Sequence, residues 1–90
     1  MIAQKFRIDS DRLIYKYDKE YDILDVYIGN ITVSFSDEID NGVYEYYSMD
    51  TDELLGVGIE DFKFKNKEHL NNILPFRLDF DYIFKNVIHN

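Results

Sequence analysis

Apolar and polar residues alternate with a period of two along most of the chain, from Arg12 to about Phe64. Clusters of turn-forming residues interrupt the alternation every six to ten positions. This pattern predicts short antiparallel strands that follow one another, each with one apolar face. The alternation is clearest at residues 24–28 and 31–36.

The pattern assigns one side of each strand to the core. We expect Leu24, Val26 and Ile28 to face it, while Tyr27 points away. We expect Asp37 to Gly42 to form a polar loop and Gly29-Asn30 a tight turn. Val43 to Ser48 is a further expected strand, and Asp50 to Asp52 a turn. The remaining core-facing positions are Leu13, Tyr15 and Tyr17 in a first strand, Ile31, Val33 and Phe35 in a half-buried third strand, and Leu55, Val57 and Ile59 in the last strand.

The period changes to that of a helix after Phe64. Asn66 is placed to cap a short helix over Lys67 to Leu74, which Pro75 prevents from continuing. Asp79 is placed to cap a second helix, whose apolar positions have the spacing i, i+3, i+4, i+7 and i+8. These positions are Phe80, Ile83, Phe84, Val87 and Ile88. The alternation of Leu78, Phe80, Tyr82 and Phe84 leaves a strand as the alternative.

Together these elements predict the fold class α+β, a small antiparallel β-meander of four or five strands packed against one or two C-terminal helices. Ninety residues are enough for a single domain, residues 1–90, in which 12–64 form the meander and 66–90 the helical segment. The chain contains no cysteine, which excludes disulfides and thiol catalysis. It has no stretch of about 20 apolar residues, so we expect a soluble, cytoplasmic protein without a membrane segment.

Charge is distributed unevenly along the chain. The net charge is −8, yet residues 20–61 contain twelve carboxylates and no Lys, Arg or His. The residues on either side of this acidic block carry a slight excess of positive charge. A segment without cations opposes direct contact with nucleic acid, because phosphate binding needs Lys and Arg. It favours attraction to a basic protein surface.

We find no local pattern that gathers these carboxylates into a catalytic or metal site. In YDKEYDILDVYIGN (residues 17–30) they are divided between a turn and at least two directions of a strand. Residues 37–40 and 50–53 lack the ligand spacing of a calcium loop, and His69 and His89 are not spaced with carboxylates as metal ligands are. We therefore expect a protein that is not an enzyme and has no cofactor or metal.

The candidate binding residues are acidic turn residues and tyrosines that the alternation turns away from the apolar face. Tyrosine is favoured at interfaces because its ring gives rigid contact area and its hydroxyl finds a partner. The candidates are Tyr27, Asp37, Glu38, Asp40, Tyr46, Asp50, Asp52 and Glu53.

Several of these segments resemble a family of short bacterial and phage proteins, domain of unknown function 2283. The resemblance rests on Tyr17-Asp18-Lys19-Glu20, Asp22 and the alternating Leu24, Val26 and Ile28, and later on Gly42-Val43, Tyr47 and Leu54-Leu55-Gly56-Val57, and it covers about residues 14–62. It implies the strand-rich fold, a bacterial or phage origin and an antitoxin-like role, and it supplies no catalytic residues. At residues 49–53 the chain lacks the Asp-Gly turn that members of this family usually have.

The sequence therefore predicts a non-catalytic acidic protein-binding module, an inhibitor or antitoxin-like partner that acts on a basic protein such as a toxin or nuclease. One alternative is a phage-type mimic of nucleic acid that inhibits a bacterial defence nuclease, as an anti-CRISPR or anti-restriction protein does. Further alternatives are a carboxylate-based metal or small-molecule binder and a homodimer.

Overall fold

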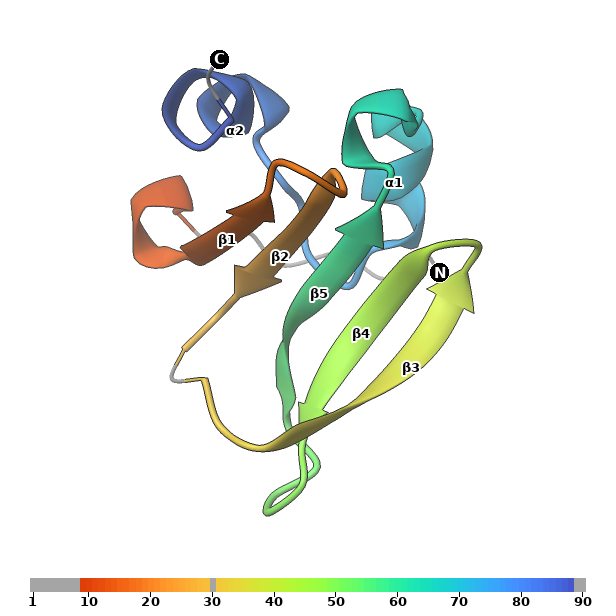
Figure 1. Ribbon diagram of the computed structural model, residues 1–90. Helices are drawn as coiled ribbons and strands as arrows, with labels where there is room; N and C mark the ends of the chain where they lie inside the picture. Colours follow the sequence, from red (N-terminus) through yellow and green to blue (C-terminus); the bar gives the residue numbers. More distant parts are fainter. Residues whose placement is uncertain (1–8, 30, 89–90) are drawn as a thin grey trace, which may run out of the picture.

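The chain folds into a five-stranded antiparallel sheet with two helices on one of its faces (Figure 1). The computed structural model describes residues 9–29 and 31–88. The elements in these residues are η1 (Ser10–Arg12), β1 (Ile14–Asp18), β2 (Ile23–Tyr27), β3 (Ser34–Asp40), β4 (Val43–Ser48), β5 (Leu54–Glu60), η2 (Phe62–Phe64), α1 (Lys67–Ile73) and α2 (Phe80–Asn86). The predicted α+β class is confirmed.

The strands do not lie in the order of the sequence. Their order is β1-β2-β5-β4-β3, so β5 lies between β2 and β4. Tight turns join β1 to β2 and β3 to β4, whereas the segment after β2 leads to β3 at the far edge of the sheet. The predicted Gly29-Asn30 turn includes Asn30, which lies outside the described residues.

The core lies between the helices and the face of the sheet that the alternation predicted. Leu24 pairs with Ile59 and Val26 with Val57, and all four side chains are fully buried. Leu13 is buried and Tyr15 and Tyr17 are half-buried on this side, as expected. Burial of apolar area of this kind supplies most of the favourable free energy of folding.

Both helices begin at the predicted caps. The Asn66 side chain accepts a hydrogen bond from the backbone N–H of His69 at 2.8 Å, and the Asp79 side chain accepts one from the N–H of Tyr82 at 3.1 Å. Such caps satisfy N–H groups that have no partner within the helix. Residues 80–86 are helical, so the alternative strand over residues 78–84 is excluded.

Lys67 fixes the junction between the sheet and the helices. Its ammonium group donates to the carbonyl oxygens of Phe62 and Lys65, both at 2.7 Å, and lies over the rings of Phe62 and Phe84. Burial lowers the pKa of this ammonium group. The contacts connect η2, α1 and α2 through one side chain.

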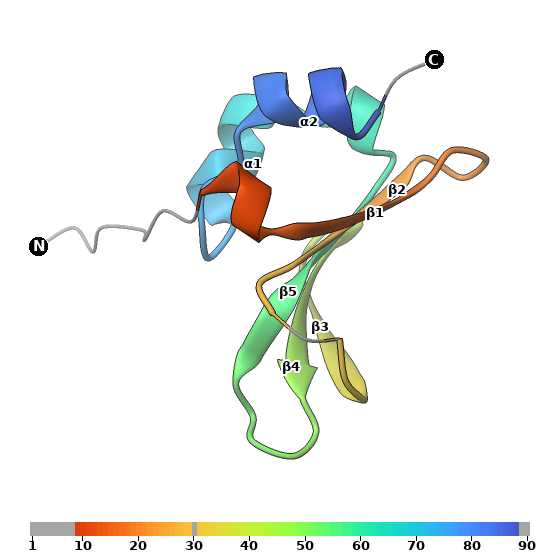
Figure 2. The same ribbon diagram turned by 90° about the vertical axis from the view of Figure 1, so that its left-hand side faces the viewer.

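The prediction for residues 31–42 was wrong in two respects. Ile31, Val33 and Phe35 are exposed and not half-buried, and the strand begins only at Ser34. The strand then continues to Asp40, through the segment that we expected to be a loop. The physical reason is that the helices cover the β1, β2 and β5 side of the sheet, while β3 and the β4–β5 loop extend away from them (Figure 2).

No helix in residues 9–29 and 31–88 has the length and apolar character that crossing a membrane requires.

Candidate protein interface

The face of the sheet opposite the helices is covered by its own tyrosines. Gly58 of β5 lies between Asp25 of β2 and Tyr44 of β4, and Gly56 lies between Tyr27 and Tyr46. The Tyr46 hydroxyl donates a hydrogen bond of 2.6 Å to an oxygen of Asp25. A Cβ atom added at Gly58 would overlap this hydroxyl. The glycine therefore makes room for a tyrosine that crosses the sheet.

The two tyrosines that we proposed as interface residues lie together on this face. The rings of Tyr27 and Tyr46 stack with centroids 5.6 Å apart. Burial, followed by the hydrogen bond to Asp25, raises the pKa of Tyr46. Burial and the charge of Asp25 raise the pKa of Tyr27. Both side chains point away from the aliphatic face, as predicted. Tyr46 also contacts Asp25 and Tyr27, so its side chain stabilises the domain as well as contributing to its surface.

A second acidic set surrounds Tyr44 on the same face. Burial raises the pKa of the Tyr44 phenol, and the nearby carboxylates of Glu38 and Glu60 raise it further. Glu38 also accepts a hydrogen bond from the backbone N–H of Gly42 at 3.2 Å. The open face is thus a layer of phenols and carboxylates, and Lys16 of β1 lies opposite Asp25 at its margin.

The part of the sheet that extends beyond the helices exposes apolar side chains. We call residues 31–38 and 47–54 the overhang. The exposed fraction is 73% for Val33, 60% for Met49, and 44% for both Ile31 and Phe35. The rings of Phe35 and Tyr47 stack at 5.5 Å, and the Tyr47 hydroxyl donates to Glu45. Grouped exposed apolar residues bordered by charge are typical of protein interaction sites.

Five of the six predicted acidic residues lie within the overhang. Asp37 and Glu38 lie on β3, and Asp50, Asp52 and Glu53 lie in the β4–β5 loop, about 10 Å away along the strand by the rise per residue. Asp37 and Glu38 are consecutive strand residues that point to opposite faces, so the carboxylates do not converge on a point.

Asp40 lies apart from them, at the β3–β4 turn. One of its carboxylate oxygens is 2.7 Å from Nε2 of His69. This hydrogen bond lowers the pKa of Asp40. Asp40 thus contacts α1 and Glu38 closes the turn, so the part of the expected Asp37 to Gly42 loop that lies on β3 is packed against its neighbours.

The β4–β5 loop is held in one conformation despite its lack of glycine. Asp52 adopts the left-handed backbone conformation, with φ of 62°, in which glycine is more usual. The Ser48 hydroxyl oxygen accepts hydrogen bonds from the N–H groups of Asp50 and Thr51. The register of β4 against β5 shifts between Tyr46 and Tyr47, close to where this loop begins.

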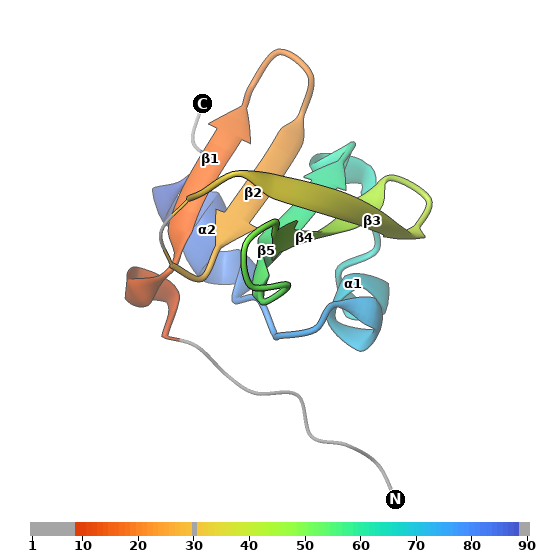
Figure 3. The same ribbon diagram turned by 90° about the horizontal axis from the view of Figure 1, so that it is seen from below.

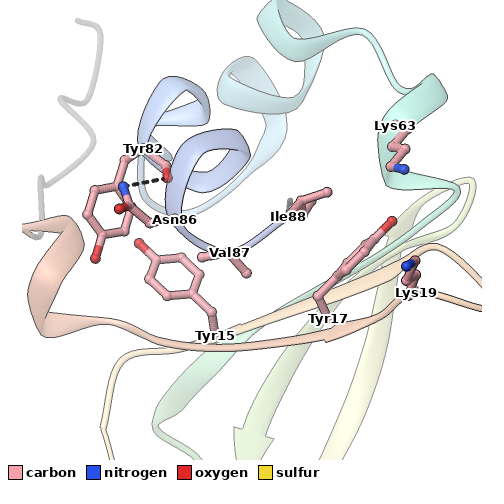
Figure 4. A pocket seen from close by; sticks show the side chains of 8 residues that line it. All are labelled: Tyr15, Tyr17, Lys19, Lys63, Tyr82, Asn86, Val87 and Ile88. Carbon is pink, nitrogen blue, oxygen red and sulfur yellow. Dashed lines mark hydrogen bonds between the residues drawn. The ribbon is translucent and has the colours of Figure 1, made fainter. Parts of the chain in front are cut away.

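A pocket of about 560 Å³ opens between β1, η2 and α2, away from the predicted residues (Figure 4). It is lined by Tyr15, Tyr17, Lys19, Lys63, Tyr82, Asn86, Val87 and Ile88. None of these side chains is a carboxylate or an imidazole. Its polar groups are the hydroxyls of three tyrosines, the ammonium groups of two lysines and the amide of Asn86.

In the described part of the chain, no group of three or more His, Asp or Glu side chains is arranged to hold a metal ion. No family model matches the chain, and neither a curated protein nor a solved structure matches it. The resemblance of residues 14–62 to domain of unknown function 2283 therefore stays a prediction.

The sequence did not reveal two parts of this surface. One is the pairing of Asp25 with Tyr46, whose signal is Gly58 on the strand between them. The other is the exposure of Val33 and Phe35, whose alternation is the same as that of a buried strand. Exposure depends on how far the helices extend, which the strand pattern does not encode.

We expect Gly58→Ala to destabilise the domain by about 1–3 kcal/mol, because the added methyl group displaces Tyr46 from Asp25. Urea unfolding of both variants measures the effect. Gly29→Ala is the matched control, since nothing lies within 4 Å of its Cβ position. Equal stability of the two variants would show that the Tyr46 crossing does not depend on Gly58.

A second expectation concerns alkaline pH. Burial and the hydrogen bond to Asp22 raise the pKa of Tyr17 to about 12. The hydrogen bond to Glu45, with burial, raises the pKa of Tyr47 to about 12. Both phenols ionise more easily in the unfolded chain, where their pKa is about 10. Their contribution to stability is therefore complete below pH of about 10 and is lost as the pH rises towards 12.

The free energy of unfolding, measured in urea at increasing pH, should fall over this interval. In a variant carrying Tyr17→Phe and Tyr47→Phe the fall should be smaller, since neither ring can ionise. An unchanged slope in the variant would assign the alkaline loss to other groups.

Proposed function

We propose that this domain is a non-catalytic protein-binding module whose partner presents a basic surface. The observation that carries the proposal is the overhang, in which exposed Val33, Phe35 and Met49 are bordered by carboxylates. Residues 20–61, which include the whole overhang, contain no Lys, Arg or His. An interface with apolar anchors inside an acidic rim suits a partner with the opposite charge.

The two kinds of residue have different roles in this proposal. Carboxylates at the rim attract a basic surface over several ångströms and accelerate association. Apolar side chains become buried only in the complex and slow dissociation. An inhibitor or antitoxin-like protein needs both properties. The resemblance of residues 14–62 to domain of unknown function 2283 supports that class of role.

Charge reversal separates these contributions. We select Asp37, Asp50 and Glu53, which are exposed and whose side chains make no hydrogen bond within the described residues. Their replacement by lysine should slow association with the partner, captured from the source cells and then purified, by about tenfold at low salt. The dissociation rate should change little. Biosensor kinetics at several salt concentrations measure both rates.

The matched control reverses three exposed carboxylates on η1, α1 and α2, which are not part of the overhang. These are Asp11, Glu68 and Asp81. The control has the same net charge as the first variant. If the carboxylates of the overhang act through their position, the control should associate at nearly the rate of the unaltered protein. If both variants slow association equally, the acidic block acts only through net charge. If neither does, it serves solubility alone and the proposal fails.

A further inference from the structure

β3 is an outer strand of the sheet (Figure 3). Its backbone groups can be assigned to two directions from the hydrogen bonds and the register. The N–H of Met49 donates to the carbonyl oxygen of Val33 at 3.1 Å, so Val33 faces β4. Backbone groups of successive strand residues point in opposite directions. The N–H and C=O groups of Ser34 and Ser36 therefore point outward, away from the sheet.

The register supports this assignment independently. Ser34 lies opposite Ser48, and the N–H of Ser48 donates to the carbonyl oxygen of Glu53 on the other side of β4. Ser34 and Ser48 are thus a pair that exchanges no backbone hydrogen bonds, whereas the backbone groups of Phe35 and Tyr47 point towards each other. Along residues 33–37 the outer edge consequently presents the N–H and C=O groups of Ser34 and Ser36, at alternate residues.

This edge lacks the usual protection against pairing with another chain. Natural edge strands carry lysine, proline or a bulge near the exposed groups. Residues 31–36 (ITVSFS) have no charged residue, no proline and no glycine, and all six are exposed. The bulge in β3 comes later, between Glu38 and Asp40. At the opposite edge, β1 carries Lys16 in its centre.

We propose that β3 binds an extended segment of the basic partner as an additional antiparallel strand. This inference rests on the proposed function and specifies how the partner is held. Backbone hydrogen bonds to Ser34 and Ser36 give the pairing, and side chains opposite β3 give the choice of partner. The segment has two basic residues opposite Asp37 and Glu38, and β-branched residues opposite Phe35 and Val33.

Charge favours such a partner over a second copy of this chain. Two copies would each bring a net charge of −8 to the contact. Cross-strand pairs of opposite charge stabilise a sheet, whereas like charges directly opposite destabilise it. A basic strand from the partner instead places apolar side chains next to Phe35 and positive charges next to Asp37 and Glu38.

The probe is the acetylated and amidated peptide Lys-Lys-Thr-Val-Thr-Ile, in which the two threonines lie opposite Ser36 and Ser34. In a titration followed by ¹⁵N-edited NMR, the amides of Ser34 and Ser36 should shift and exchange more slowly with solvent. The amide of Phe35, which already faces β4, should gain little protection. The peptide of reversed sequence should bind about tenfold more weakly, because two cross-strand charge pairs are misplaced.

Backbone methylation tests the hydrogen bonds directly. A methyl group on the nitrogen of the first threonine removes a donor that points to β3 and should abolish binding. A methyl group on the valine nitrogen, which points away, is the matched control and should preserve it. Equal binding of both methylated peptides would overturn the proposal, as would shifts confined to the tyrosine face.

A variant of the domain tests the same contact with the whole partner. Ser36→Pro removes one outward N–H and leaves the β3–β4 hydrogen bonds intact, and Ser36→Thr keeps the N–H. The proline variant should dissociate from the partner at least tenfold faster, and the threonine variant should behave like the unaltered domain.

Each outcome distinguishes this proposal from the proposed function. If the charge reversals slow association but Ser36→Pro has no effect, the module binds a basic partner without strand addition. Protection of Ser34 and Ser36 that depends on the concentration of the domain alone would identify a second copy as the occupant and overturn the proposal. Should Ser36→Pro fail to fold, the methylated peptides decide the matter.

Discussion

The helical layer of this domain is smaller than the sheet that it covers, and the distribution of buried and exposed residues follows from this mismatch. Each α-helix has seven residues and is about 10 Å long, whereas β3 and β5, with seven residues each, are about 23 Å long. Leu24, Val26 and Val57 lie under the helices and are fully buried. The overhang lies outside that cover, so the same period-two pattern produces a core on one side and an exposed surface on the other.

The acidic block serves the interior as well as the surface. A carboxylate accepts hydrogen bonds and cannot donate them, so it needs donors nearby. Residues 20–61 contain no cation, and tyrosine hydroxyls supply donors instead. Asp22 accepts from Tyr17, Asp25 from Tyr46 and Glu45 from Tyr47. The high tyrosine content and the absence of cations are therefore two aspects of one arrangement, in which these three carboxylates already have donors within the domain.

Local chemistry was predictable from the sequence, and long-range placement was not. The caps at Asn66 and Asp79 depend on a side chain and the next helical turn, so the sequence identified both. The core alternation at Leu24 and Val26 was likewise readable. The insertion of β5 between β2 and β4, and the contact of Lys67 with the Phe84 ring, join segments that are separated in the chain. For the candidate interface, the sequence identified the acidic and aromatic residues but not that Asp37 and Glu38 lie on a strand.

The position of β5 also has a consequence for the order in which the domain folds. β3, β4 and β5 are joined by short connections, and hairpins of this kind form in about 1–10 μs. β2 meets β5 only after the chain between them has closed into a loop that contains the other two strands, at a cost in entropy. That closure brings Leu24 against Ile59 and creates the surface on which the helices pack. The β3–β4 hairpin can thus be formed before the core exists, and changes to its residues within the overhang alter the folding rate more than the unfolding rate.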